Sequence, residues 1–171
     1  MRHEPIIRDE RSDDHVAIAR VIEAAFRGKP YAAGDEAELV GALRDAGALA
    51  VSLVAELDGA IVGQVALSPA TPADRSAGWY ALGPVSVRPD LQRAGIGSKL
   101  VEAGLRRIVE RGAQGCILTG DPAYYTRFGF ALAPANVPAG EPAEFFMVKR
   151  LGARTLPVGP IAFHPAFHAA G

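Results

Sequence analysis

The stretch that most constrains the fold is residues 79–112, WYALGPVSVRPDLQRAGIGSKLVEAGLRRIVERG. A strand-like apolar run ends at Val87, a polar turn follows, and Gly95 and Gly97 open an amphipathic helix predicted over residues 95–111. The first N–H groups of a helix have no partner inside it and lie at the positive end of its dipole. A strand, a glycine-containing turn and a helix start therefore predict an anion site, here for a pyrophosphate.

The glycine spacing in this turn excludes two common nucleotide-binding loops. The dinucleotide pattern G-x-G-x-x-G would need a glycine at the position of Leu100. A P-loop would need Gly-Lys-Ser/Thr, whereas the order here is Gly97-Ser98-Lys99. A helix start softened by glycine, with no ligand, is the remaining structural alternative.

Hydrophobic periodicity on both sides of this unit predicts a mixed α/β fold. Apolar residues alternate over 49–57, and Asp58-Gly59 followed by a partner strand at 61–67 predicts an antiparallel hairpin. The helix 95–111 separates strands 79–87 and 115–119, so these two strands should be parallel neighbours with a right-handed crossover. Further strands are expected at 3–8, 130–132 and 144–148. Helices are expected at 12–26, 35–46 and 121–128. Their predicted caps are Ser12-Asp13-Asp14, a capping box of Asp35 and Glu38, and Asp121.

Pro84 lies inside the strand that should be central in the sheet. Proline removes a hydrogen-bond donor and is tolerated in a strand only at an edge or a bulge. A bulge at Gly83-Pro84 would separate strand 79–87 from its parallel neighbour. The resulting wedge would leave backbone groups of Val85 and Val87 free to bind an extended ligand that carries amides, such as a pantetheine arm.

Composition limits the class of protein and its partners. A length of 171 residues fits one domain, and a net charge of −1 provides no basic surface for nucleic acid. Cys116 is the single cysteine, which indicates a reducing compartment, and we expect it to be buried and unreactive. No apolar run is long enough for a membrane span or signal peptide, so a cytoplasmic protein is expected. No metal is expected, because Pro165 interrupts the one His pair at helical spacing, His164 and His168.

Two segments resemble the GNAT superfamily of acetyl-CoA-dependent N-acetyltransferases. Residues 85–100, with the turn Gln92-Arg93-Ala94-Gly95-Ile96-Gly97, resemble motif A of that superfamily, and residues 125–130, YTRFGF, resemble its late Tyr-x-x-x-Gly-Phe signature. The resemblance covers roughly residues 4–150, and residues 120–130 with the tail 163–167 are similar to a bacterial subgroup of predicted acetyltransferases. It implies a largely antiparallel sheet with a splayed central parallel pair, flanked by helices. Residues 1–150 would form the acetyltransferase domain, and 151–171 a C-terminal extension packed on it.

The resemblance also implies roles for individual residues. Acetyl-CoA would be the acetyl donor, attacked directly by a primary amine in a ternary complex. The implied cofactor-binding residues are Val85, Val87, Gln92, Arg93, Ala94, Gly95, Gly97 and Ser98. Tyr125 occupies the position of the general acid that protonates the departing thiolate, and the alternative is that its ring only packs on the sheet. Tyr124 is expected in the core or a pocket wall.

Several points stay open from the sequence. No general base is visible, so amine deprotonation could proceed through ordered water. The acceptor is expected between residues 27–38, the loop 134–143 and the tail. A small molecule or a peptide could supply the amine, and the protein could be a monomer or a homodimer. A non-catalytic module that binds acyl-CoA is the alternative function.

Overall fold

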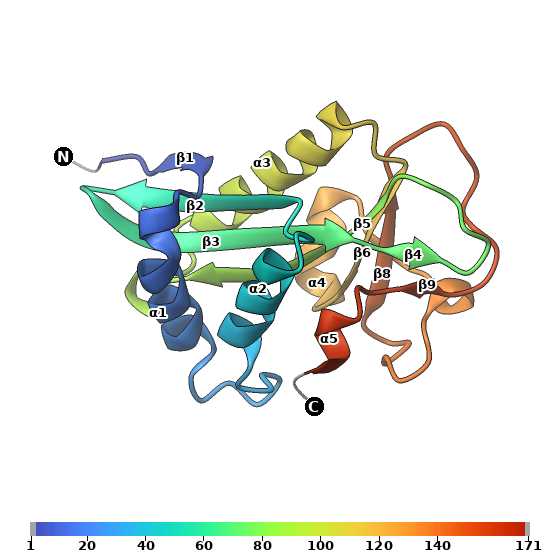
Figure 1. Cartoon of the computed structure of the whole chain (residues 1–171), viewed down its shortest axis with the longest axis horizontal. Helices are drawn as coiled ribbons and strands as arrows, with labels where there is room; N and C mark the ends of the chain where they lie inside the picture. Colours follow the sequence, from blue (N-terminus) through green and yellow to red (C-terminus); the bar gives the residue numbers. More distant parts are fainter. Residues whose placement is uncertain (1–2, 170–171) are drawn as a thin grey trace.

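The computed structural model describes residues 3–169 (Figure 1). A mixed sheet forms the centre, with helices on both sides. The helices are α1 (His15–Phe26), α2 (Glu36–Asp45), α3 (Ile96–Glu110), α4 (Pro122–Tyr125) and α5 (Ala166–Ala169), and the strands are β1 (Ile6–Asp9), β2 (Val51–Leu57), β3 (Ala60–Pro69), β4 (Thr71–Pro72), β5 (Trp79–Val87), β6 (Gly115–Thr119), β7 (Ala131–Leu132), β8 (Phe146–Arg150) and β9 (Ile161–Ala162). None of the helices within residues 3–169 is long and apolar enough to cross a membrane.

Seven strands form the main sheet in the order β1-β2-β3-β5-β6-β8-β7. Neighbouring strands are antiparallel except β5 and β6, which are parallel. The expected fold class, a largely antiparallel sheet with a central parallel pair, is confirmed. The short strands β4 and β9 form a separate pair that the sequence did not reveal.

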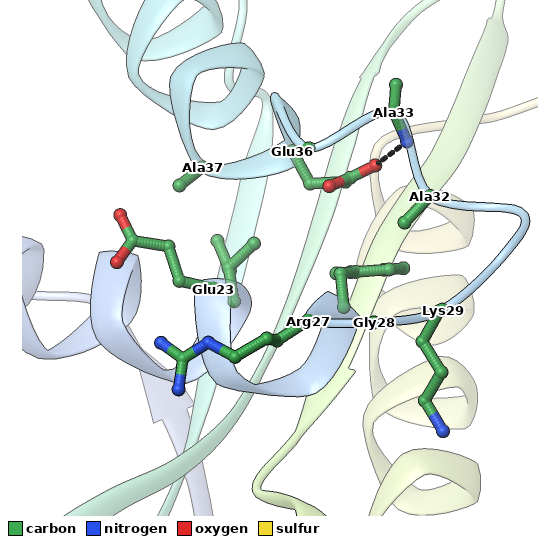
Figure 2. Close-up of a pocket in the computed structure, with 11 residues that line it drawn as sticks. Glu23, Arg27, Gly28, Lys29, Ala32, Ala33, Glu36 and Ala37 are labelled. Atoms are coloured by element: carbon green, nitrogen blue, oxygen red, sulfur yellow. Dashed lines mark hydrogen bonds between the residues drawn. The ribbon is translucent and has the colours of Figure 1, made fainter.

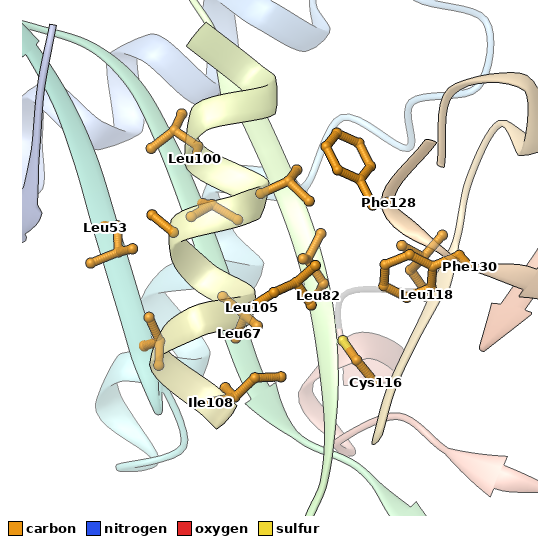
Figure 3. Packing of buried hydrophobic residues seen from close by; sticks show 14 of the residues in the cluster. Leu53, Leu67, Leu82, Leu100, Leu105, Ile108, Cys116, Leu118, Phe128 and Phe130 are labelled. Carbon is orange, nitrogen blue, oxygen red and sulfur yellow. The ribbon is translucent and has the colours of Figure 1, made fainter. Parts of the chain in front are cut away.

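The helices bury the two faces of the sheet in separate clusters. Helices α1 and α2 cover one face, where Ile18, Ile22 and Val40 pack on Val54 and Ala66. Helix α3 covers the other face, with the fully buried residues Leu53, Leu67, Leu100 and Ile108 among those packed beneath and along it (Figure 3). The amphipathic pattern of residues 95–111 is therefore satisfied by one buried and one exposed side of α3.

The helix starts differ from two of the sequence predictions. Neither Ser12 nor Asp35 caps a helix with its side chain. Asp14 instead accepts a hydrogen bond from the backbone N–H of Arg11, and Glu36 accepts one from Ala33. The Asp121 cap of α4 is confirmed, because its carboxylate accepts the N–H of Ala123 at 2.9 Å.

The C-terminal tail packs on the half of the sheet that α1 and α2 leave uncovered. Ile161 and Phe163 are buried against Trp79, Ile117 and Phe146. The buried amide of Asn136 donates to the carbonyls at 157 and 159, each at 2.9 Å, and so fixes the tail to the loop before β8. A domain division at residue 150 stays a prediction, although the tail shares a core with residues on both sides of it.

Candidate functional site

The turn between β5 and α3 presents unpaired backbone donors. Arg93 and Gly95 both have positive φ, 66° and 89°, so the turn adopts left-handed backbone conformations just before the helix begins. Within residues 3–169, no acceptor pairs with the N–H groups of residues 93–98. Ile96, Gly97 and Ser98 form the first turn of α3, where the helix dipole adds positive potential. This is the donor set that the sequence predicted for a pyrophosphate.

The backbone N–H and C=O of Val87, next to the turn, face away from β3. The N–H of Arg88 donates to the carbonyl of Val62 on the β3 side at 2.8 Å. Because neighbouring backbone groups along a strand point to opposite sides, the N–H and C=O of Val87 point toward β6. The side-chain amide of Gln92 donates to the carbonyl of Val87 at 3.0 Å. Gln92 thus occupies the carbonyl of Val87, while the N–H of Val87 is left for a ligand.

The wedge predicted from Pro84 is confirmed. Val85 pairs with Val65 of β3, and Leu82 pairs with Leu67. The step from one pair to the next is longer on β5 than on β3, so β5 carries an extra residue at Gly83-Pro84. The parallel register with β6 covers Trp79 to Ala81 among the described residues and ends before the bulge. Beyond it, no pairing joins β5 to β6 among residues 3–169. The edge of β5 that carries Val85 and Val87 is therefore unpaired on the β6 side in this part of the chain.

Tyr125 lies in an aromatic cluster next to the end of β6. Its half-buried ring meets Phe130 at a centroid distance of 6.1 Å and Tyr124 at 4.9 Å. A Cβ on Gly120 would lie 2.5 Å from Cε2 of Tyr125, so the ring occupies space that a side chain would need. Burial raises the pKa of Tyr125, and the nearby ionisable groups of Tyr124, Tyr31 and Asp121 act in the same direction. The phenol therefore keeps its proton throughout the neutral range.

Tyr124 lies closer to the turn than the sequence suggested. Its hydroxyl is 3.4 Å from Oγ of Ser98 and would be 3.2 Å from a Cβ on Gly97. The guanidinium carbon of Arg127 lies 4.6 Å from the centroid of the Tyr124 ring. The sequence identified a core or wall residue here. The contact between α4 and α3 depends on tertiary packing, and no local sequence pattern predicts it.

The expected acceptor side contains a pocket at the 27–38 connection (Figure 2). The pocket has a volume of about 380 Å³, and all its lining residues come from the end of α1, the connection and the start of α2. Two acidic residues, Glu23 and Glu36, and two basic residues, Arg27 and Lys29, are among those that line it. Neither the loop 134–143 nor the tail contributes to it, although both were expected to do so.

A carboxylate of the loop 134–143 reaches the end of β6. Glu141 accepts a hydrogen bond from Oγ1 of Thr119 at 3.0 Å. Thr119 alternates with Leu118, which packs under α3, so Thr119 faces the opposite side of the sheet, shared by the tail. Glu141 is therefore held on this face at the open end of the wedge, a placement that the loop sequence did not indicate.

Cys116 and the metal-binding residue types add no second site. Cys116 is fully buried, as expected, and burial raises the pKa of its thiol. In the part of the chain from 3 to 169, His, Cys, Asp and Glu side chains form no group of three able to hold a metal ion. The polar chemistry is concentrated at the turn, the wedge and the two tyrosines.

Known proteins share this sequence and architecture. The sequence profile of the Acetyltransferase (GNAT) family matches residues 9–130. The chain belongs to this family. It is 37% identical over 113 residues to YhbS of Escherichia coli K12, described as an uncharacterized N-acetyltransferase, and the match covers 66% of this chain and 67% of YhbS.

Two solved structures of GNAT acetyltransferases superpose along almost the full length. One is from Brucella melitensis in complex with acetyl-CoA, at 44% identity and a TM-score of 0.85, covering 97% of this chain and 99% of that one. The other is YhbS from Escherichia coli in complex with CoA, at 31% identity and a TM-score of 0.85, covering 100% of this chain and 96% of that one. The acetyltransferase family expected from the two motifs is confirmed.

Proposed function

We propose that this acetyltransferase transfers the acetyl group of acetyl-CoA directly to a primary amine, with donor and acceptor bound together. The observation that carries the proposal is the set of N–H groups at residues 93–98, which have no acceptor among residues 3–169, beside the edge of β5 that β6 leaves unpaired there. Relatives that share this architecture bind acetyl-CoA or CoA. Acetyl-CoA supplies an activated thioester, and the residues of this chain bind it, orient it and manage charge and protons.

The turn and the strand fit the two chemical parts of the donor. A pyrophosphate accepts hydrogen bonds only, and the N–H groups of Arg93, Gly95, Gly97 and Ser98 would donate them. Ala94 lies in the same turn. Pantetheine contains amides, and the backbone of Val85 and Val87 can pair with them as a neighbouring strand would. Gln92 would hold the edge in place through the carbonyl of Val87.

Two groups would assist the transfer itself. The N–H of Val87 would donate to the thioester oxygen and stabilise the negative charge that develops there when the amine attacks the carbonyl carbon. As the carbon–sulfur bond breaks, the hydroxyl of Tyr125 would give its proton to the departing thiolate. The attacking nitrogen would lose its extra proton to ordered water. Tyr125 holds the proton that this role requires, because a phenol is protonated at neutral pH and burial raises its pKa further.

The acceptor would approach from the face that carries α1, α2 and the tail. The 27–38 connection and the loop 134–143 both lie on that side, and Glu141 at the end of β6 offers a carboxylate to a cationic amine. A primary amine is protonated in water, so a carboxylate at the entrance favours its binding before the proton is lost. The class of acceptor we propose is therefore a small molecule or a peptide with a free amino group.

Calorimetric titration with acetyl-CoA tests the donor assignment. We expect saturable binding at micromolar concentration and a weaker response to S-acetylpantetheine, which lacks the pyrophosphate. Absence of binding at high micromolar acetyl-CoA would remove the proposed cofactor from this chain. Equal affinity for the two thioesters would remove the turn from the binding site.

A further inference from the structure

The hydroxyl of Tyr124 lies at the start of α3 and is not used by the mechanism described above. The two hydroxyl oxygens of Tyr124 and Ser98 are 3.4 Å apart, longer than the usual 2.5–3.0 Å of a bond between hydroxyls. Neither proton is therefore strongly engaged, and both hydroxyls can donate to another group. They lie beside N–H groups of residues 93–98 that have no acceptor in the part of the chain described by the structure.

Three neighbours fix the ring that carries this hydroxyl. Arg127 lies over the ring face at 4.6 Å from its centroid. Tyr125 and Phe128 contact the ring at centroid distances of 4.9 Å and 5.3 Å, with interplanar angles of 88° and 66°. A ring held on several sides loses little further freedom when its hydroxyl binds a ligand. The guanidinium of Arg127 also adds positive charge next to the turn.

Gly97 allows this hydroxyl to come close to the helix start. A Cβ at Gly97 would lie 3.2 Å from the hydroxyl oxygen of Tyr124 and 3.7 Å from Cγ2 of Val87. A glycine at position 97 therefore lets the Tyr124 hydroxyl approach the helix start closely. The hydroxyls of Tyr124 and Ser98 and the N–H groups at the helix start can all donate to a phosphate oxygen.

We propose that Tyr124 is a cofactor-binding residue whose hydroxyl, with that of Ser98, donates to the pyrophosphate of the bound CoA. The inference rests on the proposed function and adds a side-chain contact from α4 to the backbone cradle of α3. The bound pyrophosphate would then bridge the two helices across the wedge. Because Tyr125 follows Tyr124 on α4, this bridge also holds the proton donor in place.

The test compares CoA, dephospho-CoA and S-acetylpantetheine on the full chain with Tyr124→Phe. The variant keeps the ring and removes only the hydroxyl. A hydrogen bond to a charged group predicts that the affinities for CoA and dephospho-CoA both fall on the order of tenfold. The affinity for S-acetylpantetheine should not change. Tyr80→Phe, on the paired part of β5, is the control and should bind all three ligands as the unmodified protein does.

Each other result overturns the inference. CoA affinity within twofold of the unmodified protein would make Tyr124 a packing residue. An equal loss for S-acetylpantetheine would show an effect on pocket shape, and a loss for CoA that disappears with dephospho-CoA would assign the contact to the 3′-phosphate. If the unmodified protein binds no CoA, the proposed function fails first, and this result is distinct from a failure confined to Tyr124→Phe.

Discussion

Tyr124 and Tyr125 are adjacent in sequence, yet they face different parts of the candidate site. Tyr125 packs against Gly120 and Phe130 next to the wedge, while the hydroxyl of Tyr124 reaches Ser98 on α3. A one-turn helix separates the directions of successive side chains, so one short element can supply two functions. The proposed proton donor and the proposed pyrophosphate ligand should therefore respond differently to loss of a single oxygen.

Tyr125→Phe should lower kcat about 10- to 100-fold, the low end of the usual effect of a general acid, because a thiolate leaves readily. Acetyl-CoA affinity should stay within about twofold, because the ring and its packing are retained. Steady-state kinetics and calorimetry on the same preparation measure both quantities. An unchanged kcat would leave Tyr125 with a packing role only.

The pH profile of kcat offers an independent check on Tyr125. Its pKa is raised above the ordinary value of about 10. Since the acid form is the active one, Tyr125 should cause no loss of kcat between pH 7 and about pH 10. A fall in kcat within that range, as the pH rises, that disappears in Tyr125→Phe would contradict the assignment.

At the scale of elements, the parallel pairing of β5 with β6 depends on a glycine. Gly115 lies opposite Trp79 in the register, and a Cβ there would overlap the buried indole ring. Gly115→Ala should reduce the free energy of unfolding by about 2 kcal/mol or more, because a packed core does not absorb the added volume. Denaturant unfolding measures the change. Gly41→Ala is the matched control.

Gly41 lies inside α2 with nothing within 4 Å of the added methyl. Its replacement by alanine should be neutral or stabilise the protein by up to about 1 kcal/mol, through helix propensity. A Gly115→Ala variant as stable as Gly41→Ala would show that the indole can move, and that the β5–β6 register is less constrained than its packing indicates.

A buried ion pair joins β1 to the start of α1. Arg8 donates to both oxygens of Asp14, at 2.8 and 3.2 Å, and Asp14 also accepts the N–H of Arg11 at 2.7 Å. The hydrogen bond from Arg8 holds the pKa of Asp14 below its usual value. Asp14→Asn leaves the Arg8 cation with one carboxylate fewer and should cost about 3 kcal/mol at pH 7.

The pH dependence of this cost has a definite sign. The pKa of Asp14 is lower in the folded than in the unfolded state, so its contribution is complete above about pH 4 and is lost as the pH falls through the folded value. The stability difference between Asp14→Asn and the unmodified protein should therefore shrink below about pH 4. Asp13→Asn, at an exposed position in the same turn, should show a small cost at every pH. An equally large, pH-independent cost in Asp14→Asn would point to lost packing instead.

Patterns local in sequence predicted most of the elements and much of the site. The Asp58-Gly59 turn, the amphipathic α3 and the Pro84 bulge each depend on neighbouring residues, and each appears as expected. The contacts that were missed join distant segments, as in the pairing of β4 with β9 and the contact of Glu141 with Thr119. Such contacts depend on how loops cross the sheet, and loop sequence alone does not determine that path.

At the scale of the whole molecule, the tail completes the core on the face of the sheet that also carries α1 and α2. Phe163 is buried and contacts Phe146 and Phe167 at centroid distances of 6.1 and 5.0 Å. Phe163→Ala should cost about 3 kcal/mol or more of unfolding free energy, through lost burial and the cavity left behind. Val158→Ala, at a residue that is 79% exposed, should stay within about 0.5 kcal/mol.

Thermal or denaturant unfolding of these two variants separates a core role from a surface role. If the tail were only an appendage, Phe163→Ala would unfold like Val158→Ala. A large difference would mean that residues 1–150 alone lack part of the core beside Trp79 and Ile117. This face of the sheet would then depend on the tail for its shape.

The most direct test of the account is release of CoA thiol from acetyl-CoA across an amine panel, with the acetylated product identified by mass. The panel would cover polyamines, aminoglycosides, amino acids and peptide N-termini. We predict thiol release that depends on at least one amine, with one acetylated product per thiol. Saturable binding of acetyl-CoA with no amine-dependent release above the uncatalysed rate would contradict the account, and would identify a module that binds acyl-CoA without transferring its acetyl group.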